Sequence, residues 1–220
     1  MTDGFHPPVE EYLETIQALT EEGVPVIQAR IAERLGRSAP SVSEMLDRLT
    51  IDGYLTRSGR VIELTQEGRT LADSVIRKHR LAERLLVDII GLPWHKAHVE
   101  AGRWEHVISD EVELRLVALL GNPSTCPHGN PIPGAPAVDD VLQVALSDVS
   151  PGSTVRLRRI TEEVELDMVA LEYLDSHGLV PGTMAEVRDR APDGTVTLQL
   201  GEATVALGAA LSRQVYASAS

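Results

Sequence analysis

The chain has 220 residues, enough for one large domain or two modest ones, and its 43% apolar content can supply a buried core. A polar start and the lack of an apolar run of about 18 residues argue against a signal peptide or a membrane span, so we expect a cytoplasmic protein without a membrane partner. The net charge of −13 argues against nucleic-acid binding by the chain as a whole, but residues 24–60 carry six arginines against four acids, which permits local phosphate contacts.

The first three predicted helices follow one another as in a helix–turn–helix protein. Residues 8–22 form a first amphipathic helix whose early acids suit the helix dipole, and residues 26–35 form a second helix that Gly36 ends. A third helix covers residues 38–49, with Pro40 in its first turn. Its outward side chains are small and hydroxylated there, which lets a recognition helix lie deep in a DNA major groove.

A short hairpin after the third helix extends this pattern to a winged helix. Residues 54–57 and 60–64 read as two strands joined at Ser58 and Gly59, and Arg57 and Arg60 flank the tip, where they suit backbone phosphates or are ordinary surface charge. Glu44 could accept a hydrogen bond from cytosine. The candidate DNA-contacting residues are Arg30, Ser38, Ala39, Pro40, Ser41, Ser43, Glu44, Arg48, Arg57 and Arg60.

The next two predicted helices, over residues 66–90 and 94–107, carry histidines and glutamates at helix-turn spacing. His79 and Glu83 are four residues apart and share a face, and a second stripe holds His98, Gly102 and Glu105, with His106 beside it. Gly91, Leu92 and Pro93 break the helix between them, so the two segments should fold back as an antiparallel pair. Imidazoles and carboxylates brought together in this way predict a site for a divalent transition metal.

The rest of the chain changes character twice. A helix over residues 110–120 adds more apolar surface than a winged helix can cover, which predicts self-association. A linker rich in proline and glycine, residues 121–137, contains the lone Cys126, whose role is packing, metal ligation or redox chemistry. The final part alternates like a small β-barrel. We predict strands at 146–152, 154–157, 185–188, 196–200 and 203–207, and a helix at 166–177.

Five motifs of the sequence carry a resemblance to a known family: Val9–Leu13, Arg30–Leu35, Arg77–Leu86, Arg103–His106 and His128–Gly134. They resemble the diphtheria toxin repressor family, which contains the iron- and manganese-dependent repressors of bacteria. The resemblance implies a mainly helical protein with a β-rich C-terminal part, and a homodimer that binds palindromic double-stranded operators when loaded with metal. It implies a winged helix-turn-helix domain over residues 1–67, a helical dimerisation and metal-binding domain over 68–137, and a C-terminal SH3-like (FeoA-type) domain over 138–220.

The resemblance also implies two metal sites per subunit. One site is similar to His79, Glu83 and His98, joined in some members by a Cys-x-His pair that matches Cys126 and His128, and by a ligand from the barrel that we match to Asp167. The other is similar to Glu11, Glu105 and His106 with the backbone carbonyl of Gly102, and Glu14 lies one turn after Glu11.

Two positions depart from the iron-type members of the family. Those members have methionine in place of Glu11 and cysteine in place of Gly102, whereas manganese-type members have acids at both places. Because carboxylates favour Mn(II) while Cys126 favours Fe(II) or Zn(II), we expect Mn(II) or Fe(II) as the metal, with Co(II), Ni(II) or Zn(II) also bound in vitro. The missing side chain at Gly102 predicts a weaker or differently built site, in which Glu14 could substitute.

Other interpretations remain open at this stage. His98 and His128 could be structural, Cys126 could be a small hydrophobic residue, and Asp167 could simply begin a helix. The cluster could serve a metallohydrolase through an activated water, or the protein could be a winged-helix regulator that senses an organic ligand. No additional base or oxyanion donor is evident in the sequence, so we predict a metal-dependent repressor rather than an enzyme.

Overall fold

The computed structural model describes residues 8–136 and 141–219. The chain divides into two compact units, residues 1–79 with 102–113 and residues 80–101 with 114–220, and each is described here by itself. Within the described ranges no helix is both long and apolar enough to cross a membrane. A mainly helical N-terminal part and a C-terminal antiparallel sheet confirm the predicted fold class.

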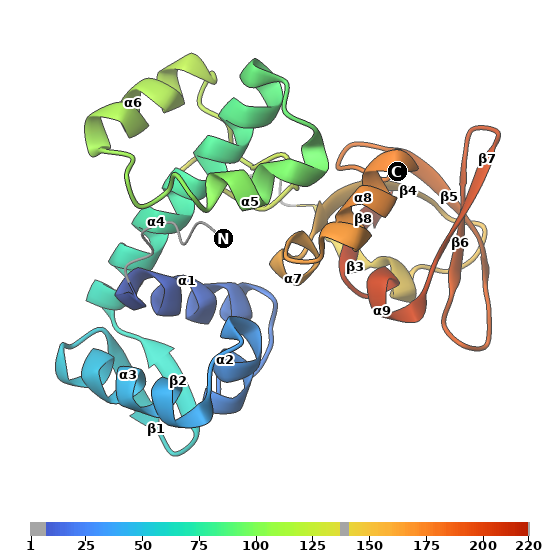
Figure 1. Cartoon of the computed structure of the whole chain (residues 1–220). Helices are drawn as coiled ribbons and strands as arrows, with labels where there is room; N and C mark the ends of the chain where they lie inside the picture. The colour runs from blue at the N-terminus through green and yellow to red at the C-terminus, as the bar shows by residue number, and fades with distance from the viewer. Residues whose placement is uncertain (1–7, 137–140, 220) are drawn as a thin grey trace. The chain divides into compact units, whose positions relative to one another are not determined.

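The first unit begins with a winged helix (Figure 1). Its core is formed by apolar side chains from every element, among them Leu13, Ile31 and Leu46, which are buried. Ser38 caps the third helix by accepting a hydrogen bond from the Ser41 amide, as its position before Pro40 predicts. The elements are α1 (Pro8–Glu21), α2 (Gln28–Leu35), α3 (Ala39–Ile51), β1 (Leu55–Ser58) and β2 (Val61–Leu64).

The wing turns one residue later than the sequence suggests. Strands β1 and β2 pair antiparallel, with Ser58 opposite Val61, so the two turn residues are Gly59 and Arg60. Gly59 has a positive φ of 62°, which glycine adopts at little cost and which fixes the turn at this point. Arg60 therefore lies in the turn itself and not on the flanking strand.

Helix α4 (Gln66–Arg84) starts in the first unit and continues into the second, where it passes into a π-helical segment, η1 (Leu85–Ile90). The hydroxyl of Thr65 accepts a hydrogen bond from the Gly68 amide at 3.1 Å and so caps the N-terminus of the helix. The helix predicted over 94–107 is wrong in extent, because helical structure is limited to η2 (Trp94–Lys96) and α5 (Ala97–Ala101), followed by turns up to residue 107. Gly102, a poor helix former, stands where the helix ends.

The remaining elements are helix α6 and the C-terminal sheet with its short helices. Helix α6 (Asp110–Leu119) follows Ser109, whose hydroxyl caps it through the Val112 amide. The C-terminal sheet is antiparallel throughout, in the order β3-β8-β4-β5-β6-β7. Its elements are β3 (Val144–Ala145), η3 (Leu146–Asp148), β4 (Thr154–Ile160), α7 (Glu162–Glu165), α8 (Met168–Ser176), β5 (Met184–Arg190), β6 (Val196–Leu200), β7 (Ala203–Leu207), α9 (Ala209–Ser212) and β8 (Val215–Ala219).

Two features of this sheet differ from the sequence prediction. The strand predicted at 146–152 is wrong, because Leu146–Asp148 is a short 3₁₀ helix in which Ser147 bonds to Asp148, and such residues favour local turns over strand pairing. Strand β8 was not predicted, although it pairs with β4 in the middle of the sheet. Buried side chains from the strands and from α8, including Leu157, Leu171 and Val187, form the core of this part.

Candidate functional site

The first cluster of potential metal ligands lies within the first unit and contains Glu10, Glu14, His79, Glu105 and His106. The Nδ1 atom of His79 contacts Glu105 Oε2, and potential ligand atoms of Glu14, His79 and Glu105 all lie within 4.8 Å of one another. His106 places Nε2 at 3.0 Å from Glu105 Oε1 and Nδ1 at 2.5 Å from Glu10 Oε2. Three separate segments thus bring two imidazoles and three carboxylates together.

The charges of this cluster act on one another strongly because the site is buried. Burial favours the neutral carboxyl of Glu105, but the His79 and His106 imidazoles outweigh it and lower the pKa of Glu105 to about 2. Burial opposes the charged form of His106, but the carboxylates of Glu105 and Glu10 raise the pKa of that imidazole above its usual value. These interactions favour the ionised carboxylate of Glu105 and the protonated imidazole of His106.

The neighbouring residues on α1 have a different environment. Glu11 faces the N-terminal side of α3, with its Oε2 at 3.6 Å from the Arg37 guanidinium. Tyr12 is buried, makes a side-chain hydrogen bond with Ser41 in the first turn of α3, and has a raised pKa because burial disfavours its phenolate. The structure therefore connects α1 to the start of α3 through Glu11 and Tyr12, and brings Glu10 and Glu14 to the first cluster.

The second cluster lies within the second unit and consists of Glu83, His98, Cys126, His128 and Glu165. Glu83 is fully buried at the end of α4, and potential ligand atoms of Glu83, Cys126 and His128 lie within 4.8 Å of one another. His98 Nδ1 is 3.3 Å from Glu83 and 3.0 Å from Glu165, and His128 Nδ1 is 3.1 Å and 3.3 Å from the same two carboxylates. The C-terminal part of the chain thus contributes a carboxylate through α7.

A tight loop positions the linker residues of this cluster. Asn130 donates hydrogen bonds to the Ile160 carbonyl at 2.9 Å and to Glu165 Oε1 at 2.5 Å, so it orients the barrel carboxylate. Gly129 has a φ of 91°, and a Cβ atom there would lie 2.0 Å from the Arg158 carbonyl oxygen. The ring of Trp94 packs on that of His128, with centroids 4.6 Å apart. Only glycine permits the loop to approach β4 so closely.

The pKa values of the two ionisable residues from the linker are both raised, but burial acts on them in opposite ways. Burial, reinforced by the charges of Glu83 and Glu165, raises the pKa of the Cys126 thiol well above its usual value. Burial opposes protonation of His128, but Glu165 and Glu83 outweigh it and raise the pKa of the imidazole. A bound cation would favour the thiolate and the neutral imidazole, which are the forms that ligate.

The structure groups the expected ligands differently from the sequence in two respects. Glu11 is turned toward Arg37, and Asp167 caps α8 by accepting hydrogen bonds from the Val169 and Ala170 amides. The barrel carboxylate in the second cluster is Glu165, two residues earlier. Gly102 lies in the turn after α5 and can offer only its backbone carbonyl, as the sequence implies.

Two residues of the clusters were missed by sequence reasoning. Glu10 was read only as an acid suited to the helix dipole, and its spacing of four from Glu14 was the available signal. Glu165 lies among several acids, and its position between the apolar residues Val164 and Leu166 was a weak sign of burial. Both clusters combine carboxylates with imidazoles, and the second adds a thiol, so their donor chemistry fits a divalent transition metal.

The surface of the winged helix presents a separate candidate site. Ser41, Glu44 and Arg48 are exposed along one face of α3, opposite the buried Val42 and Leu46. Such a stripe of polar side chains on a recognition helix is typical of base contacts in the major groove.

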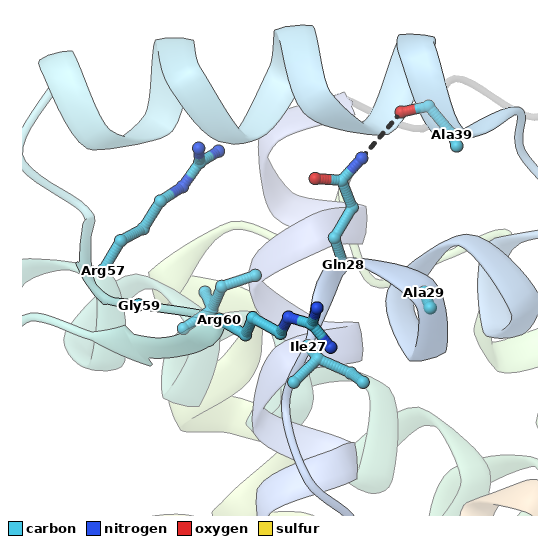
Figure 2. Close-up of a pocket in the computed structure, with 8 residues that line it drawn as sticks. Ile27, Gln28, Ala29, Ala39, Arg57, Gly59 and Arg60 are labelled. Carbon is cyan, nitrogen blue, oxygen red and sulfur yellow. Dashed lines mark hydrogen bonds between the residues drawn. The ribbon is translucent and has the colours of Figure 1, made fainter.

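A groove of about 410 Å³ separates the wing from the helices α2 and α3 (Figure 2). Among the lining residues, Gln28 donates a hydrogen bond to the Ala39 carbonyl at 3.0 Å, while Arg57 and Arg60 line the wing side. Arg57 is held toward α3 by an ion pair with Asp47 at 2.8 Å. Arg30 and Arg48 also have acidic partners, Glu33 and Asp52, at 2.7 and 3.6 Å. The charges of Arg30, Arg48 and Arg57 are therefore partly neutralised before any ligand binds.

Comparison with known proteins adds an independent line of evidence. Three family models match the chain: the N-terminal DNA-binding domain of iron-dependent repressors over residues 5–60, their metal-binding and dimerisation domain over residues 65–134, and the FeoA domain over residues 144–219. Together they cover most of the chain and follow the order of elements described above.

Individual relatives agree with these matches. The chain is 50% identical over 200 residues to the iron-dependent repressor IdeR of Mycobacterium tuberculosis, with 86% of each protein covered. It is 46% identical over 202 residues to the diphtheria toxin repressor of Corynebacterium diphtheriae, covering 86% of this chain and 87% of that protein. A solved structure of a manganese-dependent transcriptional repressor in complex with manganese matches with a TM-score of 0.86 at 30% identity, covering 96% of this chain and 100% of the other.

Proposed function

The chain belongs to the diphtheria toxin repressor family of metal-dependent, DNA-binding transcriptional repressors, and from this premise we propose that divalent metal at both clusters controls its binding to a palindromic operator. Family membership confirms the resemblance seen in the motifs. Because the family consists of transcriptional repressors, we expect regulation of transcription and no catalytic turnover.

The observation that carries this proposal is the double role of α1. Glu14 on this helix lies within 4.8 Å of His79 and Glu105, while Tyr12 bonds to Ser41 at the start of α3. The apolar face of the same helix, including Leu13, is buried in the winged-helix core. Ligation of α1 would therefore restrain the helix that supports the recognition helix.

We propose two metal sites per subunit, built from the residues of the two clusters. The first would use Glu14, His79, Glu105 and His106, and the second Glu83, His98, Cys126, His128 and Glu165. A bound divalent cation supplies charge that offsets the clustered carboxylates and fixes their positions. Glu11 and Asp167 are left out because their carboxylates serve Arg37 and the cap of α8.

The donor types suggest which metals fit. The side-chain donors of the first cluster are carboxylates and imidazoles without sulfur, which favours Mn(II) or Fe(II) over later metals, whereas the thiol of Cys126 makes the second more tolerant of Zn(II). Co(II) and Ni(II) should bind in vitro. We propose Mn(II) or Fe(II) as the activating metal, and changes in its concentration as the signal.

DNA binding is proposed to involve two copies of the winged helix in a homodimer. Two-fold symmetry would place two α3 helices about one turn of DNA apart, matching a palindrome. We keep the division at residues 1–67, 68–137 and 138–220 as a proposal; the boundary near 137 lies outside the described residues. The proposed DNA contacts come from Arg30, Ser38, Ala39, Pro40, Ser41, Ser43, Glu44, Arg48, Arg57 and Arg60.

The test begins by selecting duplexes from a random pool with the Mn(II)-loaded protein. Affinity for a selected duplex is then measured by fluorescence anisotropy with Mn(II) and with a chelator, at one salt concentration because phosphate contacts depend on salt. We expect the unmodified protein to bind the duplex tightly only with metal. In His79→Ala, Mn(II) should no longer increase the affinity for the duplex. Equal affinity in metal and in chelator would overturn the proposal.

A further inference from the structure

Both ring nitrogens of His106 have a carboxylate partner in the first cluster. Glu10 Oε2 is 2.5 Å from Nδ1, and Glu105 Oε1 is 3.0 Å from Nε2. The side chain of His106 is only 1% exposed, whereas that of Glu10 is 26% exposed at the rim. The ring is therefore fixed in orientation, with Nδ1 toward α1 and Nε2 toward Glu105.

A histidine binds a metal through one nitrogen, and the other nitrogen usually donates its hydrogen to a carboxylate or carbonyl. That second contact sets the tautomer, holds the ring in place and makes the ligating nitrogen more basic. In this cluster the acceptor beside Nδ1 is Glu10, while Nε2 points toward Glu105, which also contacts His79. The imidazole of His106 thus lies between the carboxylate of Glu10 and that of Glu105, and Glu105 is one of the proposed metal ligands.

We propose that Glu10 is a positioning residue that keeps the hydrogen of His106 on Nδ1 and presents Nε2 to the metal. This inference deepens the proposed function and rests on metal binding at the first cluster. Glu10 itself does not need to touch the ion.

The neighbouring acid, Glu11, cannot position His106 in the same way. Residues 10 and 11 point about 100° apart around a helix, and Glu11 is directed to Arg37 at 3.6 Å. Residues 10 and 14 share a face, so Glu10 and Glu14 reach the same cluster. The two adjacent acids at the start of α1 therefore have separate tasks, one toward the metal site and one toward the recognition helix.

The first measurement compares Mn(II) affinity, from the electron paramagnetic resonance signal of free Mn(II), in Glu10→Ala, Glu10→Gln and Glu67→Gln. Loss of such a carboxylate typically weakens metal binding by about 10–100-fold, so Glu10→Ala should fall in that range. Glu10→Gln keeps an acceptor oxygen and the size of the side chain, and should lose less. Glu67 is an exposed acid in the first turn of α4, so Glu67→Gln controls for lost charge and should bind as the unmodified protein does.

The second measurement identifies the ligating atom directly. Zn(II)-loaded protein with heavy-isotope nitrogen in its histidines is examined by NMR, with His106 assigned through His106→Gln. We expect metal on Nε2 and hydrogen on Nδ1, and a mixture of the two arrangements in Glu10→Ala. If Glu10→Ala fails to fold, the same comparison is made with Glu10→Gln, where a smaller shift toward the mixture is expected.

The outcomes separate this inference from the function on which it rests. Unchanged Mn(II) affinity in Glu10→Ala, or metal on Nδ1 in the unmodified protein, would overturn the role of Glu10 while leaving metal-dependent DNA binding intact. Operator binding that ignores Mn(II) would instead overturn the proposed function, and the NMR result would still decide how His106 is held.

Discussion

Replacement of Gly129 by alanine should damage the second cluster through its backbone and not through any ligand. A Cβ atom at this position would lie 2.0 Å from the Arg158 carbonyl oxygen and 2.7 Å from the Arg159 Cα, and both are backbone atoms. The φ of 91° adds the usual cost of placing a side chain in the left-handed region, roughly 1 kcal/mol. Forcing β4 and the loop apart should cost a further ~2 kcal/mol.

Gly121→Ala is the matched control for this prediction. Its φ of 73° is also positive, but nothing lies within 4 Å of an added Cβ, so it should cost only the backbone term of roughly 1 kcal/mol. Urea unfolding of metal-free protein can be followed by Trp94, which packs on His128 and donates to the Pro127 carbonyl, in a Trp104→Phe background. Gly129→Ala should lose about 3 kcal/mol of unfolding free energy.

The same variant should also lose metal from one site only. Because Gly129 lies between His128 and Asn130, its displacement moves the linker donors away from Glu165, whereas the first cluster belongs to the other unit. Metal stoichiometry should fall from two to one per subunit under the proposed assignment. Equal loss of stability in Gly129→Ala and Gly121→Ala would refute the argument from close approach.

Three further predictions concern the charged and ligating residues of the clusters. Because the pKa of Glu105 is lowered to about 2, its ion pairs contribute stability that is present above its usual pKa near 4.5 and is lost as the pH falls toward 2. Urea unfolding of metal-free protein at several acidic pH values should show this loss of unfolding free energy. The loss should be smaller in Glu105→Gln. The pKa values of His106 and His128 are raised, so a metal that binds these imidazoles must displace protons. Calorimetric titration with Mn(II) near pH 6.5 should therefore give binding heats that depend on the ionisation enthalpy of the buffer. Identical heats in two buffers would contradict this prediction. Cys126→Ser should lower Zn(II) affinity at the second cluster far more than Mn(II) affinity, as measured by competition with a chromophoric chelator, because thiolate is the soft ligand there.

The local signals in the sequence predict the winged helix well because its elements are capped by their own neighbours. Ser38 before Pro40 starts α3, and Gly36 in the left-handed region ends α2. The wing is less exact, since the choice between two adjacent turns depends on which residue adopts a positive φ. Gly59 settles that choice and moves Arg60 into the turn.

The clusters were harder to predict because helix spacing defines a face but not its partners. His79 and Glu83 were found from their spacing, but that spacing gave no sign that His79 Nδ1 contacts Glu105. The choice of Glu165 over Asp167 depends on Asn130, a residue 35 positions away in sequence, which donates to it. A cap such as Asp167 and a ligand such as Glu165 are both acids near a helix start, so only tertiary contacts separate them.

The arrangement on α1 also limits how metal can affect DNA binding. A ligand shifts an equilibrium only if it binds one state more tightly, so under the proposed metal assignment the first cluster must differ between the DNA-competent state and its alternative. Within the first unit, α1 carries Glu10 and Glu14 on one face and Glu11 and Tyr12 toward α3, and a rigid helix cannot move one face without the other. If metal binds this cluster as proposed, restraint of the cluster would also restrain the start of the recognition helix. By the reciprocity of linked binding, operator DNA must raise metal affinity by the same factor by which metal raises operator affinity.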